Sequence, residues 1–598
     1  MGYRAPVDDI MLTLKSTADL DGLIASGIYG GLDEETIRAV LEEAGRFAAE
    51  VLDPLNWTGD RAGSRLVDGR VETPAGWKEA YAAFSAAGWN ALPGSEAYGG
   101  QGLPCIVASA VGEIWNSANL AFGLCPLLTQ GAIHALEATG SEALKALYLP
   151  RMISGEWTGT MNLTEPHAGS DLASLVTRAV RQPDGTYRIF GTKIFITYGD
   201  HKLTENIIHF VLARLPDAPP GTRGISLFLV PKRLVGADGS LGARNDVVCA
   251  GLEHKLGIHA SPTCVMKYGE SGEGATGYLV GEENKGLAAM FIMMNEARLA
   301  VGIQGVAVAE RATQRANDYA RERRQGRTFA TPAGAMAPII SHPDVRRNLM
   351  MMRASTLAAR GICLATAAAV DVSQRAADPS ARAEASHRVA LLTPVAKAWP
   401  TDIGVEMSSI GVQIHGGMGF IEETGAAQHF RDSRILPIYE GTNGIQAIDL
   451  AVRKLPMESG QVVRAFIAEL RETAVAAQQV NAPAFGRMGD KLVEAVAALE
   501  RATDWMLARH AGGTAVDNEA ILASAAPYLA LFGITSGGCF LARNALAAHR
   551  AGGDKADDPI AMARFFAKNV AVAAAGTASV VMDGADSLLA VSADRLMA

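Results

Sequence analysis

The sequence predicts an α+β protein in which helices and strands occupy separate stretches of the chain. In the first part, apolar residues such as Ile37, Leu41 and Ala44 recur at helical spacing. Near Trp157 the pattern changes to short β-rich runs separated by Pro and Gly turn signals. Helical periodicity returns at Gly286 and persists. We therefore expect a β domain set between helical domains.

These changes of pattern divide the 598 residues into five segments. A chain of this length is expected to form several domains, at roughly 150 residues per domain. Long helical periods cover residues 287–323, 342–377 and 384–410, and long helices in succession favour a bundle. Pro394 and Pro400 can kink or split the last of them. The predicted segments are an N-terminal extension (1–33), an N-terminal helical domain (34–160), an antiparallel β domain (161–285), a four-helix bundle (286–455) and an extra Ala-rich helical domain (456–598).

Composition and charge exclude several classes of protein. Hydrophobic residues make up 49% of the chain and charged residues 20%, which excludes a disordered or collagen-like chain. A formal net charge of −9 argues against a protein that coats nucleic acid. The cysteines are scattered without a CxxC pair, so we expect neither a zinc site nor a disulfide framework. A reducing, cytoplasmic location fits this usage, and the N-terminus does not resemble a secretory signal.

One stretch is long and apolar enough to cross a bilayer. Residues 520–542 carry no charge. They also contain Pro527, Gly533, Gly537 and Gly538, which favour a buried helical hairpin over a membrane span. We therefore expect no stable membrane insertion.

Two clusters in the β domain are suited to holding a flat polar ligand. Residues 161–171 form a loop of small, hydroxyl and glycine residues, which can present backbone N–H groups to an anionic or carbonyl-rich ligand. An ordinary turn has the same composition. Residues 193–197 end a strand with Phe195 and Thr197, where a ring could lie on a planar cofactor and a hydroxyl could bond its edge. A plain alternating strand is the alternative.

Two further clusters lie in the bundle. Residues 413–420 contain three glycines that allow close approach of a ligand, or simply end a helix. His415 within them is either a base or a structural residue. Residues 438–446 place Glu440 in an apolar stretch before a Gly and Asn-Gly turn. Desolvation there would raise the pKa of its carboxyl, as a general base near neutral pH requires, whereas a solvated glutamate would have no such role.

Taken in order, the four clusters resemble those of the acyl-CoA dehydrogenase family. The matching residues are Thr164-Glu165-Pro166-x-Ala168-Gly169-Ser170-Asp171, Ile196-Thr197, Gly416-Gly417-x-Gly419-Phe420 and Ile438-Tyr439-Glu440-Gly441-Thr442. The resemblance covers about residues 40 to 454. It implies a helical domain, a β domain and a four-helix bundle with FAD between them. It also implies α,β-dehydrogenation of an acyl-CoA thioester to the 2-enoyl-CoA.

The resemblance assigns the catalytic base to Glu440. This residue would remove the α-proton while the β-hydride passes to flavin N5, and its backbone N–H with a flavin ribityl hydroxyl would stabilise the enolate. Some family members carry the base immediately before the Arg298 position, where this chain has Ala297. Glu296 is one residue away, about 100° around the helix. That favours Glu440 as the sole base.

The other site residues follow from the resemblance one position at a time. Phe195 stands where many members have Trp, and Gly444 where Gln is common. Arg323, Gln325, Gln413, Gly416 and Gly417 match residues that reach the FAD of a neighbouring subunit. The remaining implied FAD contacts are Met161, Leu163, Thr164, Gly169, Ser170, Phe195, Thr197, Thr442, Asn443 and Gly444. The implied acyl-CoA contacts are Ser170, Asn295, Arg298, Tyr439 and Gly441.

The resemblance also implies partners and a subgroup. It implies at least a homodimer, with an electron-transfer flavoprotein as the electron acceptor. The Tyr3-Arg4-Ala5-Pro6 opening, residues 254–263 and the extra C-terminal domain resemble the large subgroup that includes 3-methylmercaptopropionyl-CoA dehydrogenases. An acyl-CoA oxidase that uses oxygen remains an alternative. So does a DNA-associated flavoprotein of the same fold, although acidic residues outnumber basic ones in 456–598 by 15 to 12.

Overall fold

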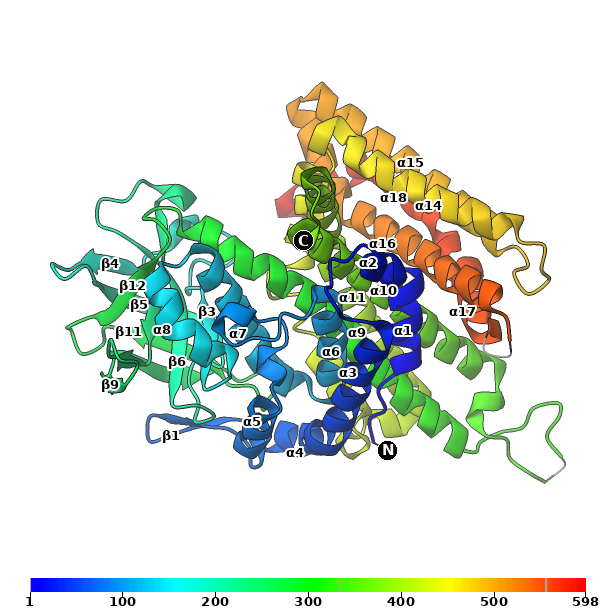
Figure 1. Ribbon diagram of the computed structural model, residues 1–598. Helices are drawn as coiled ribbons and strands as arrows, with labels where there is room; N and C mark the ends of the chain where they lie inside the picture. Colours follow the sequence, from blue (N-terminus) through cyan, green and yellow to red (C-terminus); the bar gives the residue numbers. More distant parts are fainter. Residues whose placement is uncertain (1, 333, 554–555, 598) are drawn as a thin grey trace.

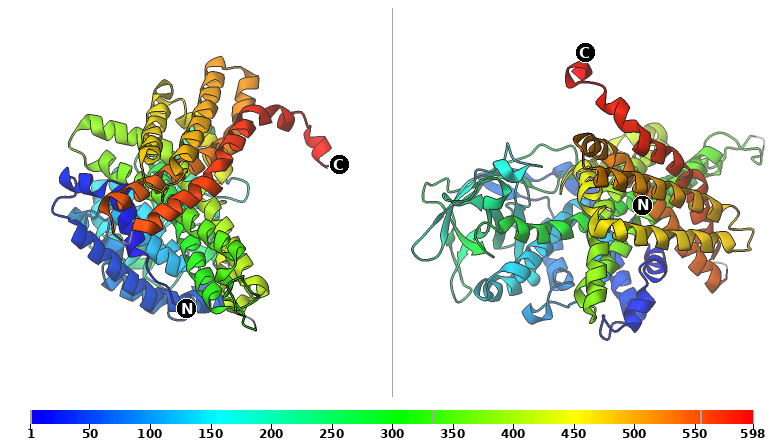
Figure 2. Two further views of the ribbon diagram at one scale, coloured as in Figure 1. Left: turned by 90° about the vertical axis from the view of Figure 1, so that its right-hand side faces the viewer. Right: turned by 90° about the horizontal axis from the view of Figure 1, so that it is seen from above.

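The computed structural model describes residues 2–332, 334–553 and 556–597. It confirms the α+β arrangement, with the strands at one end of the molecule and helices forming the rest (Figure 1). The helices after residue 460 lie over the bundle, and the chain's C-terminal end projects from the body (Figure 2).

The N-terminal part is helical apart from one short hairpin. Its core is aromatic, with Phe84 meeting Trp115 and Phe122 edge to face. Asp33 caps α3 by accepting a hydrogen bond from the Thr36 N–H. The elements are α1 (Val7–Ser16), α2 (Leu20–Ala25), α3 (Glu34–Phe47), α4 (Asp53–Ala62), β1 (Arg65–Val67), β2 (Arg70–Glu72), α5 (Trp77–Ala86), α6 (Cys105–Ala118), α7 (Leu120–Thr139) and α8 (Glu142–Ile153).

The β domain is built on one eight-stranded sheet with the order β10-β11-β5-β12-β7-β6-β3 and β4 beside β5. Most neighbours are antiparallel, but β3 runs parallel to β6, so the sheet is mixed rather than wholly antiparallel. The strands of this sheet are β3 (Trp157–Asn162), β4 (Arg178–Arg181), β5 (Tyr187–Thr197), β6 (Asn206–Arg214), β7 (Ile225–Pro231), β10 (Val247–Leu252), β11 (Thr263–Tyr268) and β12 (Ala275–Val280). A separate two-stranded sheet pairs β8 (Arg233–Val235) with β9 (Leu241–Arg244).

Three long helices and one short one form the bundle: α9 (Gly286–Glu322), α10 (Pro343–Arg375), α11 (Pro379–His415) and α13 (Asn443–Ile448), with α12 (Ala426–Ser433) before the last. Helix α11 continues through Pro394 and Pro400 and is not split. Glycines let α9 lie directly on this stretch. A Cβ on Gly302 would lie 1.9 Å from the Ala396 carbonyl oxygen, and one on Gly305 would lie 2.3 Å from that of Pro400.

The C-terminal helices share one apolar core with the bundle and the N-terminal part. The elements are α14 (Gln461–Gln479), α15 (Met488–Gly512), α16 (Ala515–Ala551), α17 (Asp557–Asn569) and α18 (Ala574–Leu589). The hairpin predicted for residues 520–542 is wrong, because α16 is one continuous helix. Its glycines serve packing rather than a turn. Gly533 and Gly537 lie against Trp399, and Gly538 lies against Leu492.

Four helical stretches in the described residues reach membrane-spanning length and hydropathy: Gly286–Glu322, Pro343–Arg375, Ala515–Ala551 and Asp557–Leu589. In Pro343–Arg375, 89% of the most apolar 18-residue window is buried inside the protein. In Asp557–Leu589 the buried share of that window is only 33%.

Candidate active site

Glu440 lies on a tight loop between α12 and α13. Its backbone is left-handed, with φ of 57°, and Gly441 follows at 83°. The Gln446 side-chain amide donates to the carbonyl oxygens of Glu440 (3.3 Å) and Gly441 (3.5 Å). Within the described residues the Glu440 N–H donates to no protein acceptor. Gln446 therefore holds a glutamate whose backbone is strained and whose N–H is free. Backbone strain of this kind is common at functional sites.

The surroundings of Glu440 favour a proton acceptor that works near neutral pH. Burial raises the pKa of its carboxyl to about 7, and the positive charges of Arg298 and Lys397 oppose part of that rise. Arg298 comes from α9 and is itself buried. It donates to Asn295 Oδ1 (3.2 Å) and lies 3.8 Å from Asp449. The predicted acyl-CoA residues Asn295 and Arg298 thus lie beside the predicted base.

Tyr439 extends the loop into the core. Its hydroxyl donates to Gln304 of α9, and the Gln304 amide donates to Asn116 of α6 (3.1 Å). Gln304 is completely buried and Asn116 nearly so. The loop that carries Glu440 is therefore joined to α9 by a hydrogen bond and, through Gln304, to α6. The Thr442 hydroxyl caps α13 by accepting from the Ile445 N–H (3.2 Å), and Gly444 is exposed.

The β-domain residues form a second group at the ends of β3 and β5. The Ile194 N–H donates to the Thr164 carbonyl (2.9 Å), so the loop after β3 lies against β5. The Phe195 ring is 57% exposed and its backbone has a φ of 61°. Met161, Leu163, Thr164 and Thr197 are half-buried beside it, and Gly169 and Ser170 are exposed on the loop. An open aromatic surface flanked by hydroxyls and backbone fits a flat heterocyclic group.

A buried ion pair that the sequence reasoning missed supports this loop. Lys193 Nζ lies 2.8 Å from Glu165 Oε1 and donates to the Leu163 carbonyl (2.9 Å). Glu165 also accepts from the Val176 and Thr177 N–H groups. Both charges are shielded from solvent, with exposures of 0% and 1%. The two residues are 28 positions apart, so the sequence alone does not show that they pair. Glu165 lies in the 161–171 loop and Lys193 in the 193–197 segment.

The predicted neighbouring-subunit residues lie far from Glu440. Arg323 follows α9 and Gln325 begins the next loop, while Gln413, Gly416 and Gly417 lie at the end of α11, all of them exposed. At 1.5 Å per residue, the 25 residues from Arg298 to Arg323 span about 37 Å along α9. Arg323 therefore lies at the opposite end of α9 from the Arg298 region. His415 is structural, since its Nδ1 bonds the Gly411 carbonyl (2.7 Å) and its ring stacks on Tyr319.

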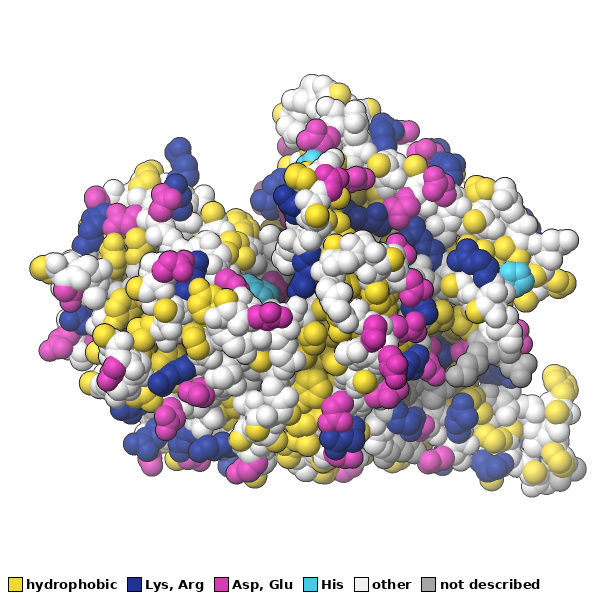
Figure 3. Space-filling view, in the orientation of Figure 1, with side chains coloured by type: hydrophobic (Ala, Val, Ile, Leu, Met, Phe, Trp, Pro, Cys, Tyr) yellow, Lys and Arg dark blue, Asp and Glu magenta, His cyan; other side chains and the backbone are white. Residues whose placement is uncertain are grey.

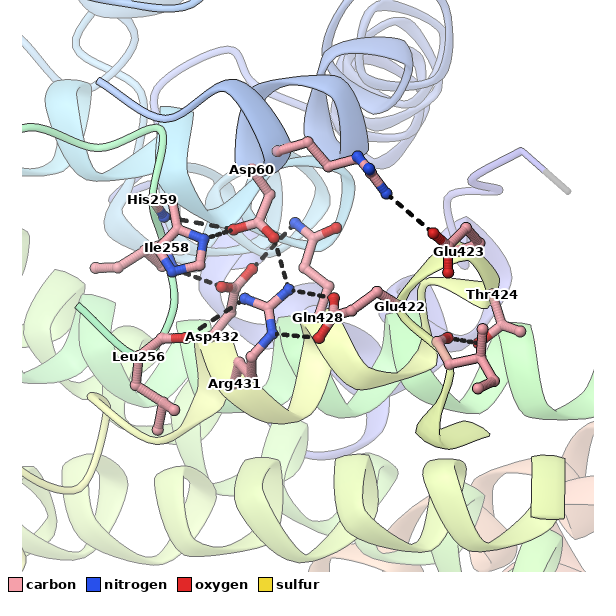
Figure 4. Close-up of polar contacts among 12 residues, drawn as sticks. Asp60, Leu256, Ile258, His259, Glu422, Glu423, Thr424, Gln428, Arg431 and Asp432 are labelled. Atoms are coloured by element: carbon pink, nitrogen blue, oxygen red, sulfur yellow. Dashed lines mark hydrogen bonds and ion pairs between the residues drawn. The ribbon is translucent and has the colours of Figure 1, made fainter. Parts of the chain in front are cut away.

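A charged cluster joins the N-terminal helical domain, the β domain and the bundle at one point (Figure 4). Asp60 of α4 accepts from Arg431 of α12 (2.7 Å) and lies 2.8 Å from His259, which precedes β11. Asp432 accepts from Gln428 and from the Ile258 N–H. Burial and the neighbouring Asp60 raise the pKa of Asp432 to about 7. The cluster ties the β domain to the bundle, and sequence reasoning did not find it.

Comparison with known proteins identifies the fold and the family. The N-terminal, middle and C-terminal domain profiles of acyl-CoA dehydrogenases match residues 34–156, 160–269 and 284–455. An "acetyl-CoA dehydrogenase C-terminal like" profile matches 463–592. The 3-methylmercaptopropionyl-CoA dehydrogenase of Ruegeria pomeroyi is 49% identical over 99% of this chain and 100% of its own length. The chain belongs to the acyl-CoA dehydrogenase family.

Solved structures of other acyl-CoA dehydrogenases share the whole architecture. Caenorhabditis elegans ACDH-11, solved with C11-CoA, superposes with a TM-score of 0.76 at 20% identity, over 96% of this chain and 92% of its own. A Bacillus anthracis acyl-CoA dehydrogenase complexed with FAD gives 0.74 at 21% identity, over 95% and 90%. The chain is thus an acyl-CoA dehydrogenase of a family that uses FAD.

Proposed function

We propose that this enzyme oxidises a short acyl-CoA thioester, with 3-methylmercaptopropionyl-CoA as the leading candidate, and that Glu440 is the base. The observation that carries the assignment of the base is the left-handed, half-buried Glu440, whose carboxyl feels the positive charge of Arg298. The full-length similarity to the Ruegeria pomeroyi enzyme supports the choice of acyl chain.

Bound FAD would supply the acceptor for the β-hydride. The chain's own residues supply the rest of the chemistry. A carboxylate oxygen of Glu440 takes the α-proton of the thioester. The N–H of the same residue is available to donate to the thioester carbonyl, where negative charge develops as the proton leaves. Gln446 keeps the loop fixed while this charge forms, and the positive charge of Arg298 favours the carboxylate form of Glu440.

Two groups of residues would hold FAD. Met161, Leu163, Thr164, Phe195 and Thr197 would hold the isoalloxazine ring, and Thr442 and Gly444 would meet the adenosine side. The Asn443 side chain bonds inward to α11, so any contact of this residue with the cofactor would not come from its amide group. Ser170, Asn295 and Gly441 would meet the CoA thioester.

A homodimer accounts for the remaining residues. The long separation of Arg323 and Gln413 from Glu440 supports a second FAD, brought by a partner subunit. We propose in addition a cytoplasmic enzyme, in keeping with its six unpaired cysteines, that passes electrons to an electron-transfer flavoprotein.

The DNA-associated alternative finds no support in the C-terminal helices. Arg543 is turned inward onto Glu469 (2.7 Å), and Arg509 pairs with Asp517 (3.4 Å). Figure 3 shows acidic and basic side chains interspersed over these helices on the face it displays. Phosphate binding requires clustered cations instead.

The test is anaerobic titration of the purified protein with four thioesters, namely 3-methylmercaptopropionyl-CoA, butyryl-CoA, octanoyl-CoA and an aryl acyl-CoA. The flavin absorbance should bleach most readily with the first, and mass spectrometry should find a product lighter by two hydrogens. Bleaching by octanoyl-CoA alone would refute the short-chain assignment. Rapid recovery of colour in air with formation of hydrogen peroxide would favour the oxidase.

A further inference from the structure

Lys397 is a buried cation next to the predicted base. It lies on α11 between Ala396 and Ala398, and none of its surface is exposed. Lysine is almost never fully buried unless it is paired, because the ammonium loses its hydration. Its Nζ donates to the side-chain oxygen of Asn443 (2.8 Å). Asn443 comes three residues after Glu440 and begins α13.

Asn443 is anchored to α11 by both ends of its amide. Its Oδ1 accepts from Lys397 and from the Thr401 hydroxyl (3.3 Å). Its Nδ2 donates to the Ala398 carbonyl (3.1 Å) and to Asp402 Oδ1 (2.8 Å). An amide bonded on both sides has little freedom to rotate or shift. Its position on α11 is therefore fixed.

The same residue closes the loop that carries the base. The Asn443 N–H donates to the Pro437 carbonyl (3.0 Å), so residues 437–443 form a closed turn with Glu440 in its middle. A displacement of Asn443 away from α11 would carry the left-handed Glu440 with it. Lys397 is thus connected to the Glu440 loop through Asn443, whose side chain bonds Lys397 and whose backbone N–H bonds Pro437.

The charged groups that act on Lys397 come from three elements. Glu440 from the loop, Asp402 from α11 and Arg298 from α9 act on Lys397. Burial brings the pKa of Lys397 down to about 7, although Glu440 and Asp402 favour its charged form and Arg298 opposes it. Arg298 and Lys397 in turn favour the carboxylate form of Glu440. Tyr439 also lies beside Glu440, and Asp449 partners Arg298.

We propose that Lys397 is a positioning residue for the reaction. Held by Asn443, its side chain fixes the Glu440 loop on α11, and in its protonated form it places a second positive charge, after that of Arg298, near the carboxylate. This inference rests on the proposed function, since it requires Glu440 to be the base.

The test compares Lys397→Met with Lys397→Arg in the full-length, FAD-loaded enzyme. Anaerobic stopped-flow absorbance would follow flavin reduction by 3-methylmercaptopropionyl-CoA from pH 5.5 to 9. Lys397→Met should reduce flavin at least tenfold more slowly at pH 7, with the acid limb of the profile moved to higher pH. The Kd of the thioester should stay within about threefold. Lys397→Arg should recover much of the rate, because it keeps the charge.

Two controls separate this role from a general loss of structure. Ser408→Ala changes another buried polar residue of α11, which bonds Ser433 instead of the loop, and should leave the pH profile unchanged. Asn443→Leu keeps Lys397 but removes the link, so it should reproduce the slow rate if Lys397→Met does not fold. An FAD-loaded Lys397→Met with the wild-type rate and profile would overturn the proposal, as would a wild-type rate for Asn443→Leu.

Glu440→Gln distinguishes failure of this inference from failure of the proposed function. If Glu440→Gln alone leaves reduction at the wild-type rate, the assigned base is wrong. If that variant is inactive but Lys397→Met behaves as wild type, only the role of Lys397 is wrong.

Discussion

Replacing Lys193 by Met tests the support of the flavin loop. Met has a similar length, so it fills the same space while removing the charge. Glu165 would then be left 1% exposed, with the Val176 and Thr177 N–H groups as its remaining hydrogen-bond donors. Removing one partner of a buried ion pair costs about 3–5 kcal/mol. For a cooperative unit of 150–250 residues this corresponds to a fall in Tm of roughly 6–20 °C.

The assay is thermal unfolding followed by dye fluorescence, together with flavin release measured by filtration. Lys193→Met should show the fall in Tm and should lose FAD more readily, because Leu163 also loses its bond to Nζ. The double variant Lys193→Met/Glu165→Gln should recover much of the Tm, since no uncompensated charge remains.

Lys202→Met is the matched control for this experiment. It breaks an exposed pair with Glu72, at 2.9 Å and about half exposed on both sides, and should cost under about 1 kcal/mol. If Lys193→Met and Lys202→Met melted together and retained FAD equally, the reasoning about the buried pair would be refuted.

Three further predictions concern the base, the bundle and the extra domain. With the pKa of Glu440 raised to about 7, flavin reduction should rise with pH and be about tenfold slower at pH 6 than on its plateau; a flat stopped-flow profile from pH 5.5 to 8 would contradict this. Gly302→Ala should lower Tm by several degrees because its Cβ would meet the Ala396 carbonyl oxygen, whereas Gly576→Ala, with nothing within 4 Å, should not, and equal melting would refute the close approach of the helices. Burial tends to raise the pKa of Glu469, but Arg388 and Arg543 outweigh it and lower that pKa to about 2. Glu469→Gln should therefore cost about 2 kcal/mol in urea unfolding at pH 7. This difference should shrink as pH falls from about 4 toward 2, where the wild-type carboxylate also loses its charge; a constant difference would argue against the ion pair.

The sequence predicted the order of helical and β segments because periodicity is a local property, whereas Glu440 as the base follows from the family resemblance and stays a prediction. Helical and strand periodicity is visible within a dozen residues, and Glu440 stands in a short motif whose apolar neighbours already indicated desolvation. The family resemblance assigned Arg323 and Gln413 to the FAD of a neighbouring subunit, and this stays a prediction, with Arg323 just beyond the far end of the 37-residue helix α9.

Residues paired across long stretches of chain could not be found in this way. Lys397 contacts a side chain 46 residues away, and Asp60 contacts one 371 residues away. Only the fold brings such charges together. An isolated lysine in an apolar helix was nevertheless a usable signal, because burial requires a partner.

The wrong hairpin in α16 has a similar cause. Glycine and proline are typical of turns, but in α16 Gly533 provides room for the Trp399 side chain of α11. Local propensity gave way to tertiary packing, which a single sequence does not show. The parallel pairing of β3 with β6 likewise joins strands that are distant in sequence, which local patterns do not show.

The most direct test of the proposed mechanism is the visible spectrum of Glu440→Gln during anaerobic addition of 3-methylmercaptopropionyl-CoA. Glu296→Gln serves as the control, because it removes a carboxylate on α9 that pairs with His134 instead of facing the loop. We predict that wild type and Glu296→Gln bleach at comparable rates, while Glu440→Gln binds FAD and stays yellow. Bleaching of Glu440→Gln at the wild-type rate would contradict the assignment of the base.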